Sequence, residues 1–242
     1  MIKLLLRNKK SLSIKIISAA FAVLFLFVCN AAAQKISQQT VITGDSMEVR
    51  RSGDVTVSKG NSKAVNGNNV ITSDNMIYNK KNSLLEASGR VKIVSVVNTK
   101  EPLEAYSSFA EYDINTEKGK LWGAKTNVKY FLSGSSAPVV LKAQEIYFNG
   151  GLETLSAFKD VEIITSSGTI FSDKAVYNKK DDTITMEKDG ESLKRPTADI
   201  YYDGRKAFYE ADKMIFHASS DSKKIIMTGG VSGKMEMEDK IQ

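Results

Sequence analysis

The ten residues SDNMIYNKKN, at positions 73–82, return as SDKAVYNKKD at positions 172–181, with six of the ten positions identical. A catalytic site is normally written once in a chain, whereas a phrase that recurs is typical of a repeating architecture. We therefore expect a repeated structural unit.

The phrase has six copies in all, and each copy reads as a small residue, usually Asp, any residue, an apolar residue, any residue, then an aromatic residue or Val. The copies are GDSMEVR from Gly44, SDNMIYN from Ser73, SSFAEYD from Ser107, AQEIYFN from Ala143, SDKAVYN from Ser172 and ADKMIFH from Ala211. Their sixth positions are separated by 29, 34, 36, 29 and 39 residues. A strict solenoid keeps a constant period, so this irregular spacing favours a chain of hairpins with loops of different lengths.

Each copy is predicted to be a strand, because its apolar fourth and sixth positions alternate with polar or variable ones. Turn residues such as those of 79–82 follow, and Asn, Asp and Gly tolerate the backbone angles of tight turns. A second strand then begins, for example LLEASGRVKIV at 84–94, and we expect similar ones at 122–130 and 155–163. Six copies of two strands predict about a dozen antiparallel strands and no helix after residue 40.

The first 33 residues have a different composition from the rest of the chain. Residues 1–15 carry five basic and no acidic side chains, residues 16–28 are apolar, and Ala31 and Ala33 are small. This order is that of a secretory signal peptide, and an apolar run of 13 residues is shorter than the roughly 20 that a spanning helix needs. We expect residues 1–33 to be a signal peptide cleaved after Ala33; an uncleaved membrane anchor is the alternative.

Residues 34–242 are expected to form a single domain with little net charge. The whole chain carries 34 basic and 28 acidic residues, and without the five basic residues of 1–33 the balance is 29 to 28, or +1. This balance does not favour a nucleic-acid partner. The only cysteine, Cys29, lies in the expected signal, and Val28 before it does not fit a lipidation signal. The remaining residues are numerous enough to bury a core without disulfides.

The phrase, its turn and the A-x-G-x-V-x-I strand that follows resemble the OstA-like repeat of the LptA family of lipopolysaccharide (LPS) transport proteins. The match is clearest in ITSDNMIYNKKNSLLEASGRVKI at 71–93, and weaker copies extend it over residues 40–235. Ser108 and Gln144 replace the Asp in two copies, and the likeness is weakest at 186–200. The resemblance implies an all-β fold, a twisted antiparallel β-jellyroll in the form of a half-open folded sandwich.

The resemblance also implies a function, that of a non-enzymatic periplasmic carrier. Lipid A acyl chains of LPS would lie in an apolar trough between the sheets, with no cofactor. Edge strands would pair with an inner-membrane LPS transporter component, with an outer-membrane LPS translocon and with further copies in a homo-oligomer, since unpaired edges are templates for strand addition. The segment 234–242 is expected to be a charged edge or tail, and 186–242 either completes the domain or forms an interaction arm.

Alternation of apolar and polar positions predicts which side chains face the trough and contact lipid. An ordinary sandwich core is the alternative interpretation of the same pattern, and methionine suits both a variable ligand and an irregular core. The predicted trough-facing residues are Met47, Val49, Met76, Tyr78, Leu85, Val91, Ile93, Tyr112, Trp122, Val128, Ile146, Phe148, Tyr177, Met214 and Phe216.

The sequence favours neither a catalytic nor a metal site. His217 is the only histidine, so a cluster of histidine ligands is excluded, and GGVSGK at 229–234 lacks the spacing of a phosphate loop. The recurring acidic residues suggest either repeated metal ligands or hydrogen bonds to backbone at strand entrances, and we favour the second. These residues are Asp45, Asp74, Asp173 and Asp212.

Three alternatives come from other classes of protein. A membrane-anchored, LptC-like component of the same export system would show a similar repeat and keep its amino-terminal helix. A carbohydrate-processing β-helix would have a tighter period and clustered carboxylates in successive turns, and the sequence shows neither. A non-lipid envelope scaffold stays open.

Overall fold

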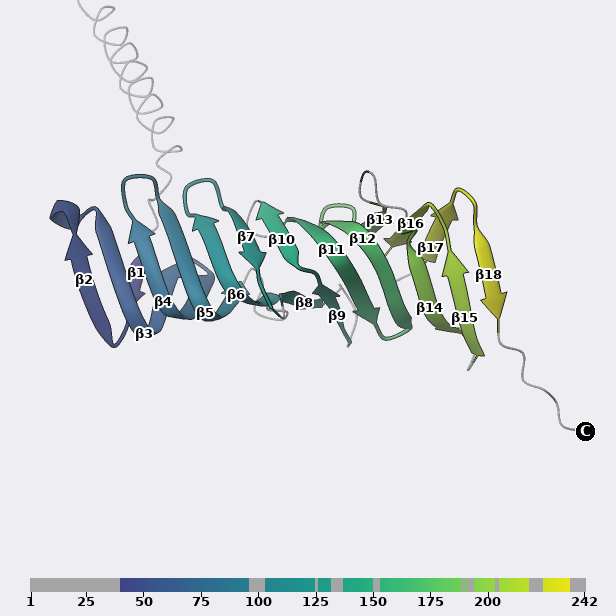
Figure 1. Cartoon of the computed structure of the whole chain (residues 1–242), viewed down its shortest axis with the longest axis horizontal. Helices are drawn as coiled ribbons and strands as arrows, with labels where there is room; N and C mark the ends of the chain where they lie inside the picture. Colours follow the sequence, from purple (N-terminus) through teal and green to yellow (C-terminus); the bar gives the residue numbers. More distant parts are fainter. Residues whose placement is uncertain are drawn as a thin grey trace, which may run out of the picture. The chain divides into compact units, whose positions relative to one another are not determined.

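Figure 1 shows the computed structural model of the chain. The structure describes residues 40–235 except 96–102, 125, 132–136, 150–152, 189, 191–193, 203–204 and 218–223. All the described residues belong to one compact unit. The expected signal peptide, its cleavage site and the tail beyond residue 235 lie outside the described residues. Within the described ranges, no helix is long and apolar enough to cross a membrane.

The described residues form eighteen strands and one short 3-10 turn at Arg51–Gly53. Six strands are long: β3 (Val55–Asn66), β4 (Asn69–Asn79), β5 (Leu84–Ser95), β6 (Leu103–Asp113), β11 (Thr154–Thr165) and β12 (Gly168–Asn178). The others are β1 (Val41–Thr43), β2 (Ser46–Arg50), β7 (Lys118–Trp122), β8 (Asn127–Phe131), β9 (Pro138–Lys142), β10 (Glu145–Asn149), β13 (Thr183–Glu187), β14 (Thr197–Tyr202), β15 (Arg205–Glu210), β16 (Lys213–His217), β17 (Lys224–Thr228) and β18 (Ser232–Met235).

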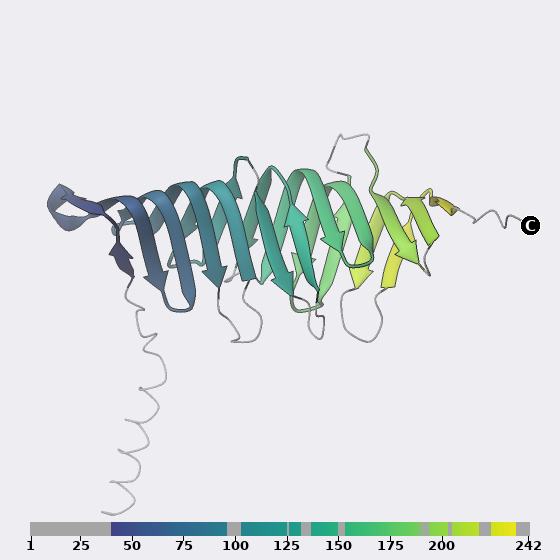
Figure 2. The same cartoon turned by 90° about the horizontal axis from the view of Figure 1, so that it is seen from below.

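The long strands bend near their middles. The register of β3 against β4 shifts between Lys59 and Ser62. The register of β4 against β5 shifts between Thr72 and Asn75, which lie beside those residues on β4. A β-bulge of this kind bends a strand and increases its local twist. Pairs of residues with positive φ mark the bends, namely Gly60–Asn61, Gly89–Arg90 and Lys159–Asp160. Each long strand therefore contributes one half to each of two layers, and Figure 2 shows the folded-over sheet.

We call the layer that contains the turns 80–83 and 179–182 the first layer, and the other the second layer. The short strands add to one layer each. In the first layer, β2 pairs with β3, β7 and β10 bridge β6 and β11, and β13, β16 and β17 follow β12. In the second layer, β1 pairs with β3, β8 and β9 bridge β6 and β11, and β14, β15 and β18 follow β12. All these pairs are antiparallel, and in Figure 1 the first-layer strand β2 lies in front whereas β13, β16 and β17 lie behind, which shows the twist.

One apolar core lies between the two layers. It runs from Ala64 in β3 to Phe216 in β16 without a break, and most of its members are almost wholly buried. Burial of apolar area of this kind is the main favourable term in folding. The prediction of a twisted, antiparallel all-β fold is therefore confirmed.

The predicted number of strands was too low, about a dozen against the eighteen observed. The sequence pattern located the strands of the first layer and missed most short strands of the second. The single strand expected over 122–130 is in fact two strands, β7 and β8, in different layers. Gly123, with φ 103, begins the crossing between them, and a residue with a side chain rarely adopts that angle.

Candidate lipid-binding interior and sheet edges

The sixth residue of each phrase copy lies in one row across the inner face of the first layer. In the registers, Tyr78 is opposite Leu85, which is opposite Tyr112. The row continues on both sides in the same way through every first-layer strand. Its members in spatial order are Val49, Thr56, Tyr78, Leu85, Tyr112, Gly119, Phe148, Leu155, Tyr177, Ile184, Phe216 and Ile225.

The phrase residue of this row occurs on every second strand, although the copies are irregularly spaced in the sequence. Neighbouring strands are about 4.8 Å apart, so the phrase residues are spaced by roughly 10 Å. The spacing of the copies along the sequence varies because the turns and second-layer strands between them differ in length. Gly119 lies between Tyr112 and Phe148 in the row, and the Phe148 ring fills the space where a side chain at Gly119 would lie. The rings of Tyr112 and Phe148 thereby stack with centroids 5.8 Å apart.

The fourth residue of each copy lies in a second inner row, next to the first and closer to the bend. Met76 is opposite Ala87, and Met186 is opposite Met214. Met76 is 1% exposed, and Met186 and Met214 are 0% exposed. The two rows therefore form the first-layer half of the apolar interior. Val91, Ile93 and Val128 are also buried, and the register places Ile93 and Val128 in one row of the second layer.

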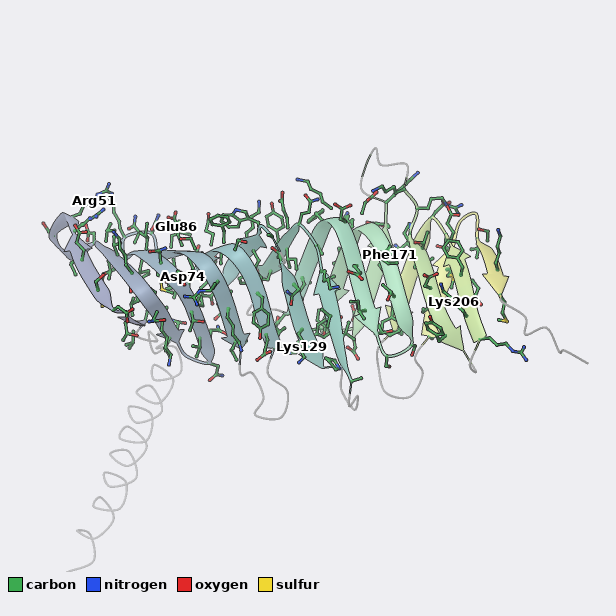
Figure 3. All side chains as sticks on the ribbon, turned by 60° about the horizontal axis from the view of Figure 1, so that its bottom comes forward. Arg51, Asp74, Glu86, Lys129, Phe171 and Lys206 are labelled. Atoms are coloured by element: carbon green, nitrogen blue, oxygen red, sulfur yellow. The ribbon has the colours of Figure 1, made fainter. Side chains whose placement is uncertain are left out.

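The first two positions of the phrase build the bend. Ser73 and Ser107 are buried, and each Oγ donates to the backbone carbonyl two residues later, at 2.7 and 2.8 Å. The next residue packs against the bulge of the neighbouring strand: the Asp74 side chain lies against Gly89 and pairs with Arg90. Figure 3 shows Asp74 on the outer side of the sheet. The phrase thus recurs because the chain passes from the second layer to the first at every second strand of the first layer.

The recurring aspartates have a structural explanation, which differs in part from the one predicted. Asp45 accepts from Asn61 at 2.9 Å, and Asp212 pairs with Arg195 at 2.9 Å. The side chains of Asp45, Asp74 and Asp212 therefore bond to other side chains. Among the described residues, no group of three or more His, Cys, Asp or Glu side chains could hold a metal ion.

One edge strand of each layer, β2 in the first layer and β18 in the second, exposes its inner-row residues. Met47 and Val49 on β2 occupy the two inner rows, yet they are 49% and 64% exposed, because the registers give β2 a partner on one side only. At the other end, Met235 on β18 is 48% exposed and pairs with Ala207 of β15. Met47 and Val49 thus lie in the inner rows, and among the described residues no strand lies beside β2 on its other side.

The layers also approach each other at the open side, opposite the bend. The ring of Tyr130, from β8, lies 4.9 Å from the ring of Tyr177, from β12. Asn69 Nδ2 donates to the Tyr112 hydroxyl at 3.5 Å, a distance at the limit of a hydrogen bond. Burial raises the pKa of Tyr177 to about 12 and raises the pKa of Tyr130 well above its usual value. These phenols are therefore neutral at physiological pH and lie in an apolar environment.

Comparison with protein families matches residues 41–153 to the model described as LptA/(LptD N-terminal domain) LPS transport protein. The matched segment, a little less than half of the chain, is therefore similar to the LptA-like family of LPS transport proteins. The matched LptA-like segment ends within the turn between β10 and β11, whereas the inner rows continue through β11 to β17. The same architecture therefore extends beyond the matched residues.

A solved structure with similarity to the chain is that of LptH, described as the LptA homologous periplasmic component of the conserved LPS transport device from Pseudomonas aeruginosa. The alignment has 13% identity and a TM-score of 0.33, and it covers 69% of this chain and 96% of LptH. A comparison with curated protein sequences gives no match.

Trp122, at the end of β7 in the LptA-like segment, was wrongly predicted to face inward. Its ring stacks on Phe109 at 5.7 Å, and Phe109 is 44% exposed on the outer face. Leu121, 0% exposed, occupies the inner position instead. The prediction ran one alternating pattern through Trp122 and Val128, but the crossing that begins at Gly123 separates them, so Leu121 was missed.

The outer face around Trp122 carries a cluster of charges and rings. Lys120 Nζ lies 5.5 Å from the Trp122 ring centroid and 5.0 Å from that of Tyr147. Glu145 accepts from Lys159 at 2.8 Å and pairs with Lys120 at 2.9 Å. Hydrogen bonds from Lys159, Lys120 and Tyr147 lower the pKa of Glu145 to about 2. The charged and aromatic side chains of this cluster bond to one another, so their arrangement does not require a ligand.

Proposed function

We propose that this protein is a periplasmic lipid carrier that holds LPS acyl chains between its two layers. It would also bridge the inner and outer membranes by pairing its edge strands with those of other transport components. The observation that carries the proposal is the continuous apolar interior, which runs from Ala64 to Phe216 and ends at uncovered inner rows. The LPS transport family of residues 41–153 supports the identity of the lipid.

An acyl chain would replace apolar contacts with apolar contacts inside such a core. Burial gains about 0.8 kcal/mol per methylene, so one chain of about a dozen carbons fully withdrawn from water would gain roughly 10 kcal/mol. A lipid held that tightly would hardly leave, so a carrier requires partial burial. The layers are joined by backbone at the bend, whereas the Asn69–Tyr112 contact at the open side is long and weak. We propose that the layers part at the open side to admit the chain.

The two ends of the molecule complement each other. In the first layer, β17 is antiparallel to β16, and β2, β4 and the other phrase strands run in the direction of β16. A β2 strand placed beside β17 of a second copy would therefore be antiparallel to it, and Val49 would follow Ile225 in the row. In the second layer, β1 and β18 run in opposite directions as well. Strand addition at such edges uses backbone hydrogen bonds that each edge leaves free.

The carrier function can be tested by photocrosslinking in living cells. A photoreactive residue at Val49, on the uncovered inner row, should form an LPS adduct, and one at Tyr78 should do so further inside. Glu48 and Lys92 are the matched outward controls: Glu48 precedes Val49 on β2, and Lys92 pairs with Glu104 on the outer face. Adducts at inward sites alone would support the carrier. Their absence in a folded, exported protein would favour a scaffold and overturn the proposal.

Edge pairing can be tested with cysteines, since Cys29 is the only natural one and lies in the expected signal. A Val49→Cys copy mixed with an Ile225→Cys copy should form a disulfide dimer, because both side chains share the inner face at opposite edges. Glu48→Cys mixed with Ile225→Cys is the control, because these residues lie on opposite faces. Equal crosslinking in both mixtures would contradict ordered pairing of copies.

A further inference from the structure

Two hydroxyl groups in the interior stand out because they are buried and no described residue bonds to them. Ser95 is 1% exposed and Tyr130 is 4% exposed, and neither Ser95 Oγ nor the Tyr130 hydroxyl has a hydrogen-bond partner among the described residues. Buried polar groups in proteins are nearly always bonded. The buried serines at the bend follow that rule, as Ser107 Oγ donates to the Phe109 carbonyl at 2.8 Å. The two unpartnered hydroxyls therefore need an explanation.

Both hydroxyls belong to one row of the second layer. Ser95 is opposite Asn69 and opposite Leu103. On the next strand, Lys129 is opposite Glu104. Because the two strands are antiparallel, Tyr130 after Lys129 lies beside Leu103 before Glu104, so Tyr130 is the next member of the row. Ser95 is six residues from Gly89 at the bend, so the row lies roughly 20 Å from the bend at the open side. We call Asn69, Ser95, Leu103 and Tyr130 the lip.

The lip combines polar atoms with an apolar interior behind them. Two residues closer to the bend, the second layer carries Ile93 and Val128, which are buried. From the first layer, Tyr177 packs on Tyr130, and Tyr112 accepts from Asn69. A ligand that entered between the layers at this side would meet hydroxyl groups first and hydrocarbon behind them. A plain hydrocarbon chain would leave both hydroxyls unbonded.

We propose that Ser95 and Tyr130 each bind oxygen atoms carried on the buried acyl chains themselves, in hydroxyl or ester groups. The lip would then select oxygenated acyl chains over unsubstituted ones. Discrimination of this kind is strong when a site's buried polar groups find a partner in one ligand and none in the other. The inference rests on the proposed carrier function and adds to it the chemical class of chain that the interior prefers.

The test measures two probes of equal length on the purified protein, myristate and β-hydroxymyristate, by competition against a fluorescent fatty acid. Wild type should bind the hydroxylated probe tighter, on the order of fivefold, the effect of one net hydrogen bond. In a Tyr130→Phe, Ser95→Ala double variant the ratio should fall to about one, with the affinity for myristate retained. Both substitutions remove a hydroxyl and keep most of the side chain.

Thermal unfolding separates ligand binding from a structural role. Because the two hydroxyls have no partner among the residues that the structure describes, Tyr130→Phe and Ser95→Ala should leave the Tm unchanged or raise it. Ser107→Ala is the matched control: it removes a bonded hydroxyl at the bend, so it should lower the Tm and leave the probe ratio as in wild type.

The outcomes separate this inference from the proposed function. Wild type that binds both probes equally would overturn the lip site and leave the carrier intact. Wild type that binds neither probe would overturn both. If the double variant keeps the wild-type ratio of affinities for the two probes, Ser95 and Tyr130 do not bind the oxygen of the ligand. If its Tm is lowered as well, the two hydroxyls bond to a partner within the protein.

Discussion

The middle of the molecule and its amino-terminal end carry the same phrase in different surroundings. Met76, the fourth residue of the copy in β4, is 1% exposed, whereas Met47, the fourth residue of the copy in β2, is 49% exposed. At the sixth position, Tyr112 is 4% exposed and Val49 is 64% exposed. The residue types are similar, and the registers place each pair in one row. What differs is the number of neighbouring strands: β4 and β6 each have a strand on both sides in the first layer, and β2 has a strand on one side.

The difference shows that the phrase encodes a unit of a continuing stack and contains no signal for where the stack ends. A phrase strand in the middle of the stack is covered by its neighbours, whereas the same kind of strand at an edge exposes its apolar inner residues to solvent. Exposed edges of this kind normally carry charges or bulges that prevent pairing. Here the inner rows at β2 stay apolar, which is the property expected of a surface that another strand covers.

The largest expected effect contrasts the two methionines directly. Met76→Ala should destabilise the protein by about 2–5 kcal/mol, because it leaves a cavity in a packed core. Met47→Ala should change the free energy of unfolding by less than about 0.5 kcal/mol in the isolated protein, because its side chain is half exposed. Urea unfolding of both variants measures the two values. Equal losses would mean that the end of the stack is covered in solution, and the contrast would fail.

Two glycines give a smaller contrast between the bend and the edge. Gly89, with φ 73, lies against the Asp74 side chain, so a Cβ there would both strain the backbone and displace that side chain. Gly53, with φ 104, has nothing within 4 Å of an added Cβ. Gly89→Ala should therefore cost roughly 2–3 kcal/mol, and Gly53→Ala about 1 kcal/mol from backbone strain alone. Thermal unfolding compares them, and a cost at Gly53 equal to that at Gly89 would remove the bend's special role.

The fold could be predicted from the sequence where the position of a residue depends only on its own strand. Tyr78, Tyr112 and Tyr177 keep their alternation through straight strands, so their inner position followed from period two. The turn position after them was equally plain: Asn79 and Asn178 each accept from the backbone two residues later, at 3.1 and 3.0 Å.

The parts that could not be predicted depend on partners distant in the sequence. Trp122 and Val128 lie in different layers because the chain crosses at Gly123, and nothing local distinguishes that crossing from a bulge. The short strand β9, which begins at Pro138, is set by pairing with β8 and β11 and lacks the phrase. The buried hydroxyls of Ser95 and Tyr130, which have no partner in the described part of the chain, were missed for the same reason, because the burial of a hydroxyl depends on both layers together.

The smallest expected effect concerns tyrosine hydroxyls that are buried between the two layers in the middle of the molecule. Burial raises the pKa of Tyr177 to about 12, so the folded protein holds this proton more tightly than the unfolded chain, whose tyrosines titrate near 10. The stability linked to this group is complete below pH 10 and is lost as the pH rises toward 12. Tyr177→Phe should remove part of that loss, so the variant should unfold at higher alkaline pH than wild type. Phenolate absorbance followed during alkaline unfolding measures this, and identical curves for both proteins would show that the middle opens to solvent before its phenols ionise.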